Sequence, residues 1–167
     1  MAALLAEGIV DKLMTYYKAN LPAKVTTLNA AYSDSFKMTA PQTGAYHAGP
    51  LQLVDNIDYP KVFVLARNTG VSRYNATFTD ADHRLDVIVA IKADTGERVQ
   101  RLMYRYGRAM WELTVSRFFA STGDDYFALH GDGDIEIEFE EIDAQITTPP
   151  YIGKVTLSFT ASKQEDV

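Results

Sequence analysis

One stretch decides the fold: Leu85-Asp86-Val87-Ile88-Val89-Ala90-Ile91, followed by the segment 97–113. In the first part, apolar residues recur at every second position with the period of a β-strand that has one buried face. In the second part they recur every three or four positions, as on an amphipathic helix, at Val99, Leu102, Met103, Tyr106, Met110 and Leu113. A strand that leads into a long helix therefore lies at the centre of the predicted fold.

The segments on either side repeat these two periods. Leu5, Ile9, Leu13 and Tyr16 predict an N-terminal helix, which we expect Pro22 to interrupt before a shorter helix over 23–32. Further strands are predicted around 62–66, 73–79, 134–140 and 154–161. The predicted fold class is α+β, with an antiparallel or mixed β-sheet and with the N-terminal helix and one long helix packed on one face.

The start of the long helix and its close packing are also predicted. Asp94 can cap the first amides, while Glu97 three residues later can reach back as in a capping box. The small residues Gly107 and Ala109 allow the helix to lie close to a sheet. We therefore expect the helix to begin at Asp94 and to pack tightly on the strands.

Length and composition restrict the class of protein. The 167 residues are the size of a single domain, 1–167, and the absence of cysteine excludes disulfides and thiolate chemistry. The net charge of −6 argues against a general nucleic-acid binder. The chain starts without the basic region of a signal peptide, and its longest apolar run is too short to span a bilayer. We expect a soluble protein with no membrane partner, made in a reducing compartment.

The segment 33–60 follows neither period. It contains Pro41, Gly44, Gly49 and Pro50 among polar residues, and structureless segments of this length are usually functional or mobile. We interpret it as a long loop or arm that serves binding. A short hairpin around Gly44 is the alternative.

Few residues suggest a catalytic or metal-binding site. Asp80, Asp82, His83 and Asp86 could form a metal site, but strand alternation places Asp82 and His83 on opposite faces, and 80–82 is typical of a turn. A second cluster around His130 also has the character of a Gly/Asp turn. We expect no catalytic residue, no metal and no cofactor, with a small metal-dependent enzyme as the alternative.

Two rows of like charge are more informative. The arginines of the long helix recur at intervals of three and four residues, opposite its apolar stripe, at Arg98, Arg101, Arg105 and Arg108. A predicted strand carries a row of acids on one face, at Glu136, Glu138 and Glu140. Both rows could simply be solvated. We interpret the arginines as subunit-interface candidates, because their guanidinium groups bind carboxylates bidentately.

The order of the elements resembles that of the tail-terminator family of tailed bacteriophages. The residues that carry the resemblance are the strand 85–91 and the following helix, where Tyr104, Tyr106, Ala109 and Leu113 look like the strand-then-helix core of that family. No single residue is diagnostic, so the resemblance is one of topology.

The resemblance implies a structural virion protein at the head–tail junction, assembled in the host cytoplasm. It would form a hexameric ring that ends the tail tube and contacts the tail-tube protein and the head connector or neck. DNA would pass through the lumen without specific binding. The glutamate row would then be a subunit interface or a lumen lining. A neck or head-completion adaptor, a tail-tube relative and a monomeric ligand-binding domain are the other readings.

Overall fold

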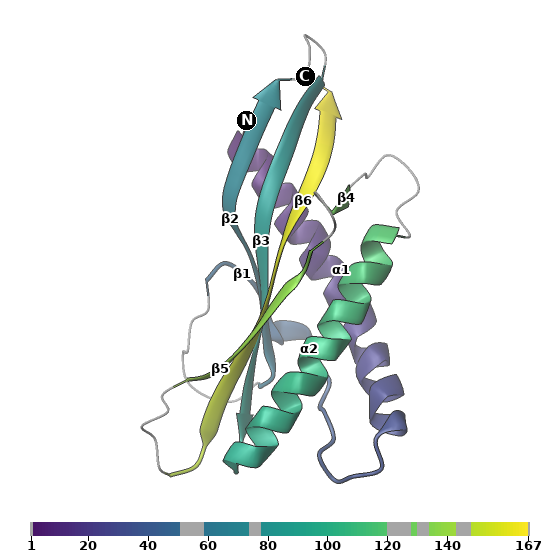
Figure 1. Ribbon diagram of the computed structural model, residues 1–167, viewed down its shortest axis with the longest axis vertical. Helices are drawn as coiled ribbons and strands as arrows, with labels where there is room; N and C mark the ends of the chain where they lie inside the picture. The colour runs from purple at the N-terminus through teal and green to yellow at the C-terminus, as the bar shows by residue number, and fades with distance from the viewer. Residues whose placement is uncertain are drawn as a thin grey trace.

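The computed structural model describes residues 2–50, 59–73, 78–119, 128–129, 134–142 and 148–166. Two helices cover one face of a six-stranded mixed sheet (Figure 1). In chain order the elements are α1 (Ala2–Ala31), a 3-10 turn (Thr43–Ala45), β1 (Tyr46–Ala48), β2 (Lys61–Arg73), β3 (Phe78–Ala93), α2 (Gly96–Phe119), β4 (Ala128–Leu129), β5 (Glu136–Ile142) and β6 (Tyr151–Asp166). The predicted α+β fold class is confirmed.

The strand order places the last strand inside the sheet. The order is β1-β2-β3-β6-β4, and β5 also pairs with β6. β1 is parallel to β2, whereas the other pairs are antiparallel. β5 lies beside the 152–158 part of β6, with Glu136 opposite Ser158 and Ile142 opposite Ile152. Among the described residues β5 pairs with no other strand, so it forms an edge of the sheet.

The core lies between the sheet and the two helices. From the sheet it takes the residues whose side chains share one face, including Val62, Val64, Leu85, Val87, Val89, Ile91, Val155, Leu157 and Phe159. From α2 it takes all six residues of the predicted apolar stripe: Val99, Leu102, Met103, Tyr106, Met110 and Leu113. The helical period of the sequence therefore identified the buried face of α2 correctly.

α1 differs from the prediction because it continues through Pro22. Proline removes one hydrogen bond of the helix, which usually ends or kinks it. Here Tyr17 and Leu21 before the proline and Val25 and Leu28 after it are all buried on the same side of the helix. Burial of this common stripe outweighs the local cost, because tertiary packing supplies most of the stability of protein helices.

The hairpin of β2 and β3 is longer than predicted. The expected separate strand over 73–79 is wrong: β2 ends at Arg73, residues 74–77 lie outside the described part, and β3 begins at Phe78. The turn expected over 80–82 is also wrong, because these residues pair with both β2 and β6. Two partner strands hold this Asp-containing segment extended despite its turn-like composition.

The beginning of α2 is shifted by one residue from the prediction. The backbone amide of Arg98 donates a hydrogen bond to the Thr95 hydroxyl at 3.2 Å, so the cap is Thr95 and not Asp94. Glu97 pairs with Arg101 at 3.0 Å instead of reaching back to the cap. The close packing is confirmed for Gly107, where a Cβ would lie 2.9 Å from the ring of Phe139 on β5.

Candidate interaction face

The four arginines of α2 do not form one exposed row. Arg101 and Arg108 are exposed and Arg98 is half-buried, but Arg105 is only 5% exposed. Arg105 lies on the side of α2 that meets the segment after α1, as its contacts with Asp34 and Phe36 show. The row predicted from the sequence is therefore divided between the surface and the interior.

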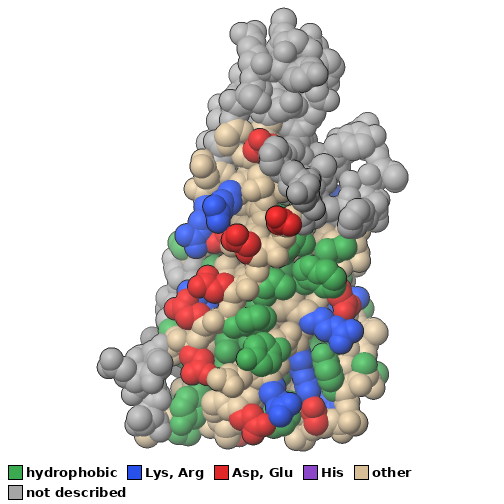
Figure 2. Space-filling model, viewed as in Figure 1, with side chains coloured by type: hydrophobic (Ala, Val, Ile, Leu, Met, Phe, Trp, Pro, Cys, Tyr) green, Lys and Arg blue, Asp and Glu red, His purple; other side chains and the backbone are tan. Residues whose placement is uncertain are grey.

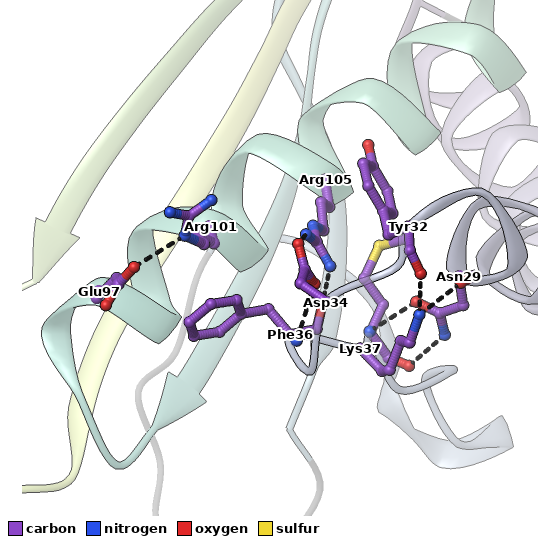
Figure 3. A network of polar contacts seen from close by, with 9 residues as sticks. Asn29, Tyr32, Asp34, Phe36, Lys37, Glu97, Arg101 and Arg105 are labelled. Carbon is purple, nitrogen blue, oxygen red and sulfur yellow. Dashed lines mark hydrogen bonds and ion pairs between the residues drawn. The ribbon is translucent and has the colours of Figure 1, made fainter.

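Arg105 holds the segment after α1 against α2 (Figure 3). Its guanidinium donates hydrogen bonds to the Asp34 carboxylate and to the Phe36 carbonyl oxygen, and its Cζ lies 3.8 Å from the ring centroid of Tyr32. The hydrogen bond from Arg105 is the largest influence on the Asp34 carboxyl and lowers its pKa. Arg105 is thus buried and held by contacts within its own chain, so it does not form part of an exposed subunit interface.

The same segment has further fixed contacts. The Asn29 side chain exchanges two hydrogen bonds with the Met38 backbone, at 2.8 and 2.9 Å. Thr39 donates its amide to the Tyr106 hydroxyl at 3.0 Å. Residues 33–42 form no helix or strand, as predicted for a loop, but these contacts fix them against α1 and α2, so the reading as an arm is wrong for this part. The alternative of a hairpin around Gly44 is also wrong, because a 3-10 turn and the parallel strand β1 follow. Residues 51–58 of the expected arm lie outside the described residues.

Arg101 and Arg108 remain on the surface. Arg101 pairs with Glu97 at 3.0 Å and Arg108 pairs with Glu112 at 2.8 Å, each within one turn of α2. The hydrogen bond from Arg108 lowers the pKa of the Glu112 carboxyl. Exposed pairs of this kind contribute only about 0.3–0.5 kcal/mol. A carboxylate from another molecule can therefore replace the partner at little cost.

The three glutamates of β5 are all exposed, as predicted for an acidic row. Their register partners on β6 belong to the sheet face that the helices leave uncovered. Glu140 pairs with Lys154 at 2.7 Å and Glu136 approaches Arg84 at 3.8 Å, while Glu138 has no ion pair among the described residues. Beside Glu136 and Arg84 lies a shallow pocket of about 200 Å³.

The sequence did not predict an exposed apolar stripe between these two rows. Tyr104 and Trp111 of α2 are 57% and 44% exposed, and Ile137 and Phe139 of β5 are 37% and 42% exposed. The ring of Phe139 lies over Gly107, and its centroid is 5.0 Å from that of Tyr104 in an edge-to-face arrangement. Because Tyr104, Gly107 and Trp111 are spaced by three and four residues, they lie along one side of α2, next to β5.

Together these residues form what we call the α2–β5 face. Figure 2 shows a band of hydrophobic side chains between β5 and α2, with several acidic side chains along the β5 side and Lys and Arg side chains along the α2 side, and with some side chains of the opposite charge on each side. We name its parts the acidic flank (Glu136, Glu138 and Glu140), the apolar stripe (Tyr104, Trp111, Ile137 and Phe139) and the basic flank (Arg101 and Arg108).

The apolar stripe corrects one expectation about β5. Its alternating pattern indicated a strand with one buried face, yet both faces are exposed from Glu136 to Glu141. β5 is at the edge of the sheet, and α2 contacts it at few points, such as Gly107 against Phe139 and Gln100 against Glu141. The signal in the sequence was the presence of Tyr104 and Trp111 outside the buried stripe of α2.

The candidate metal-binding group is not brought together as a site. Along β3 the side chains of Asp82 and Asp86 lie on the face opposite to His83, which is buried. The Asp86 carboxylate accepts hydrogen bonds from Arg67 and from the Ser158 hydroxyl, the latter at 2.8 Å. In the described ranges, no three His, Asp or Glu side chains are grouped as metal ligands. His130 lies outside those ranges.

Within the described part of the chain, neither helix is long and apolar enough to cross a membrane. The chain matches no protein-family model and no curated protein sequence.

Proposed function

We propose that this protein is a structural virion component that assembles into a ring of the tail-terminator type. In that role it ends the tail tube of a bacteriophage and joins the tube to the head connector or neck. The observation that carries the proposal is the α2–β5 face, on which an acidic flank and a basic flank are separated by an apolar stripe.

A closed ring needs two different patches on each subunit. In such a heterologous contact, one patch of a subunit meets the other patch of its neighbour. The acidic and basic flanks fit this requirement, since copies placed side by side bring Arg101 and Arg108 of one subunit to Glu138 and Glu140 of the next. Guanidinium groups bind carboxylates with two parallel hydrogen bonds, which fixes the orientation of the neighbour.

The energetics of the flanks favour exchange of partners. The ion pairs of Arg101 and Arg108 lie within one helix, although Arg101 also lies over the Phe36 ring and Arg108 also bonds to Tyr32. Glu138 has no ion pair among the described residues. Forming contacts between subunits therefore costs the single subunit little. The net charge of −6 supports passage of DNA without specific binding, because like charge repels the phosphate backbone.

The test is a charge reversal on the basic flank. Arg101→Glu with Arg108→Glu places acids opposite acids at each contact, so we expect rings seen by negative-stain imaging and native mass measurement to give way to smaller species. A matched control, Lys12→Glu with Lys18→Glu, makes the same charge change at two exposed positions of α1 and should leave assembly unchanged.

Two results would contradict the proposal. One is a wild-type protein that stays monomeric both alone and in the presence of tail tubes. The other is a doubly reversed variant that still forms rings like the wild type, with a circular dichroism spectrum that shows an intact fold.

A further inference from the structure

Side-by-side contacts between the flanks leave the apolar stripe uncovered. The stripe consists of four large apolar side chains that are each between 37% and 57% exposed and lie together on α2 and β5. Contiguous exposed apolar surface of this kind usually marks an interaction site. Aromatic residues surrounded by polar groups are also enriched at the centres of protein interfaces.

The charge pattern around the stripe identifies the partner that fits. α2 and β5 run roughly alongside each other (Figure 1), so the stripe and its two flanks follow the same direction. Suppose that a second copy is turned by 180° about an axis along the stripe and placed face to face with the first. Its acidic flank then meets the basic flank of the first copy, and its basic flank meets the acidic flank of the first copy. A rotation about an axis across the stripe places acid on acid and base on base.

We propose that two copies of this chain associate face to face through their α2–β5 faces, about a two-fold axis parallel to the apolar stripe. The apolar stripes of the two copies cover each other at the centre. Arg101 and Arg108 of each copy lie opposite Glu136, Glu138 and Glu140 of the other. This contact goes beyond the proposed ring because it is isologous and joins two copies across one surface. It uses the same two flanks, so each face makes either this contact or the ring contact.

The free edge of β5 does not supply an equivalent contact. If two β5 strands paired in antiparallel fashion with their glutamates on one face, Glu138 would lie beside acids of the other copy, which is destabilising. A shift by one residue would move every side chain of one strand to the other face and place the glutamates beside Ile137 and Phe139. The acids thus oppose pairing through the edge, while the face as a whole is complementary to itself.

The test uses the absence of cysteine from the chain. A two-fold axis along the stripe brings each stripe position close to the same position of the partner. Tyr104→Cys and Trp111→Cys, tested as single variants under mild oxidation, should form disulfide-linked dimers about tenfold more than Lys18→Cys, an exposed control on α1. Cross-linking no greater than in the control at both positions would overturn the proposal.

A second measurement tests the charges. In the Trp111→Cys background, Glu138→Lys with Glu140→Lys makes both flanks basic, and Arg101→Glu with Arg108→Glu makes both acidic. Each protein alone should lose the cross-link, while a mixture should recover it as a mixed dimer identified by its mass. A mixture that cross-links no better than the separate proteins would reject the face-to-face contact.

The two proposals fail in different ways. Symmetric disulfides without rings would reject the tail-terminator ring and support the face-to-face contact. Rings whose subunits never form symmetric disulfides would support the tail-terminator ring and reject the face-to-face contact.

Discussion

Arg105 has a different role from its neighbours in the same sequence pattern. The spacing of three and four residues placed it with Arg101 and Arg108, but its guanidinium is buried and binds Asp34 and Phe36. The sequence alone could not reveal this, because the partner residues follow α1 and lie 69 to 71 residues before Arg105 in the chain. Periodicity reports which residues share a helix side and does not report what another segment places there.

Replacement of Arg105 should therefore destabilise the fold more than replacement of Arg101. Arg105→Ala removes the charge-assisted hydrogen bonds and the contact with Tyr32, and we expect a loss of about 1.5–3 kcal/mol in the free energy of unfolding. Arg101→Ala removes an exposed pair and should cost less than about 1 kcal/mol. Urea unfolding of both variants measures the difference, and equal losses would contradict the role assigned to Arg105.

The Asp34–Arg105 pair should also make stability depend on pH. The hydrogen bond from Arg105 lowers the pKa of Asp34 in the folded protein, so the folded state binds a proton on this group less readily than the unfolded chain. The stabilisation is present above the unfolded pKa of about 4 and is lost as the pH falls through the lower folded pKa. Urea midpoints of the wild type and Asp34→Asn should differ at pH 6 and converge toward pH 2–3. A constant difference would exclude this linkage.

At the scale of elements, α2 approaches the sheet at two glycines. A Cβ at Gly153 of β6 would lie 2.6 Å from both Met103 Sδ and Val99 Cγ1, and Gly107 on α2 faces Phe139. The sequence predicted the glycine on the helix but not the one on the strand. The sheet register decides which strand residue faces the helix, and periodicity does not supply that register.

Gly153→Ala should destabilise the protein because the added methyl group overpacks this contact. Val99 is β-branched and has little freedom to move, so we expect a loss of about 1–3 kcal/mol. Gly8→Ala is the matched control, since a Cβ at Gly8 meets nothing within 4 Å and alanine favours a helix by about 0.8–1 kcal/mol. Thermal unfolding should show opposite shifts of the midpoint. An unchanged unfolding midpoint for Gly153→Ala would mean that α2 can move away from β6 without loss of stability.

Prediction of the elements from sequence succeeded where burial on one side was clear. The apolar stripe of α2 and the alternating residues of β3 and β6 all lie in the core. It was wrong where tertiary contacts opposed a local signal, as at Pro22 inside α1 and at 80–82 inside β3. For β5 the strand was predicted correctly but the burial of one of its faces was not, because alternation alone cannot distinguish an edge strand from a covered one.

At the scale of the whole molecule, charge is arranged around the apolar stripe. The sequence showed both charged rows of the candidate site, although it did not show that Arg105 is buried. It could not show that the rows lie on two sides of one face, because that depends on how β5 and α2 meet in space. The ring and the face-to-face contact are both hypotheses about this one surface, and charge reversal and cross-linking test them separately.

The central position of β6 has a consequence for synthesis. β6 lies between β3 on one side and β4 and β5 on the other, yet it follows all of them in the chain. On the ribosome the β2–β3 hairpin can form early, but β4 and β5 have no strand to pair with until residues 151–166 emerge. Completion of the sheet is thus tied to the emergence of residues 151–166, and until then β3 exposes an unpaired edge to other nascent chains.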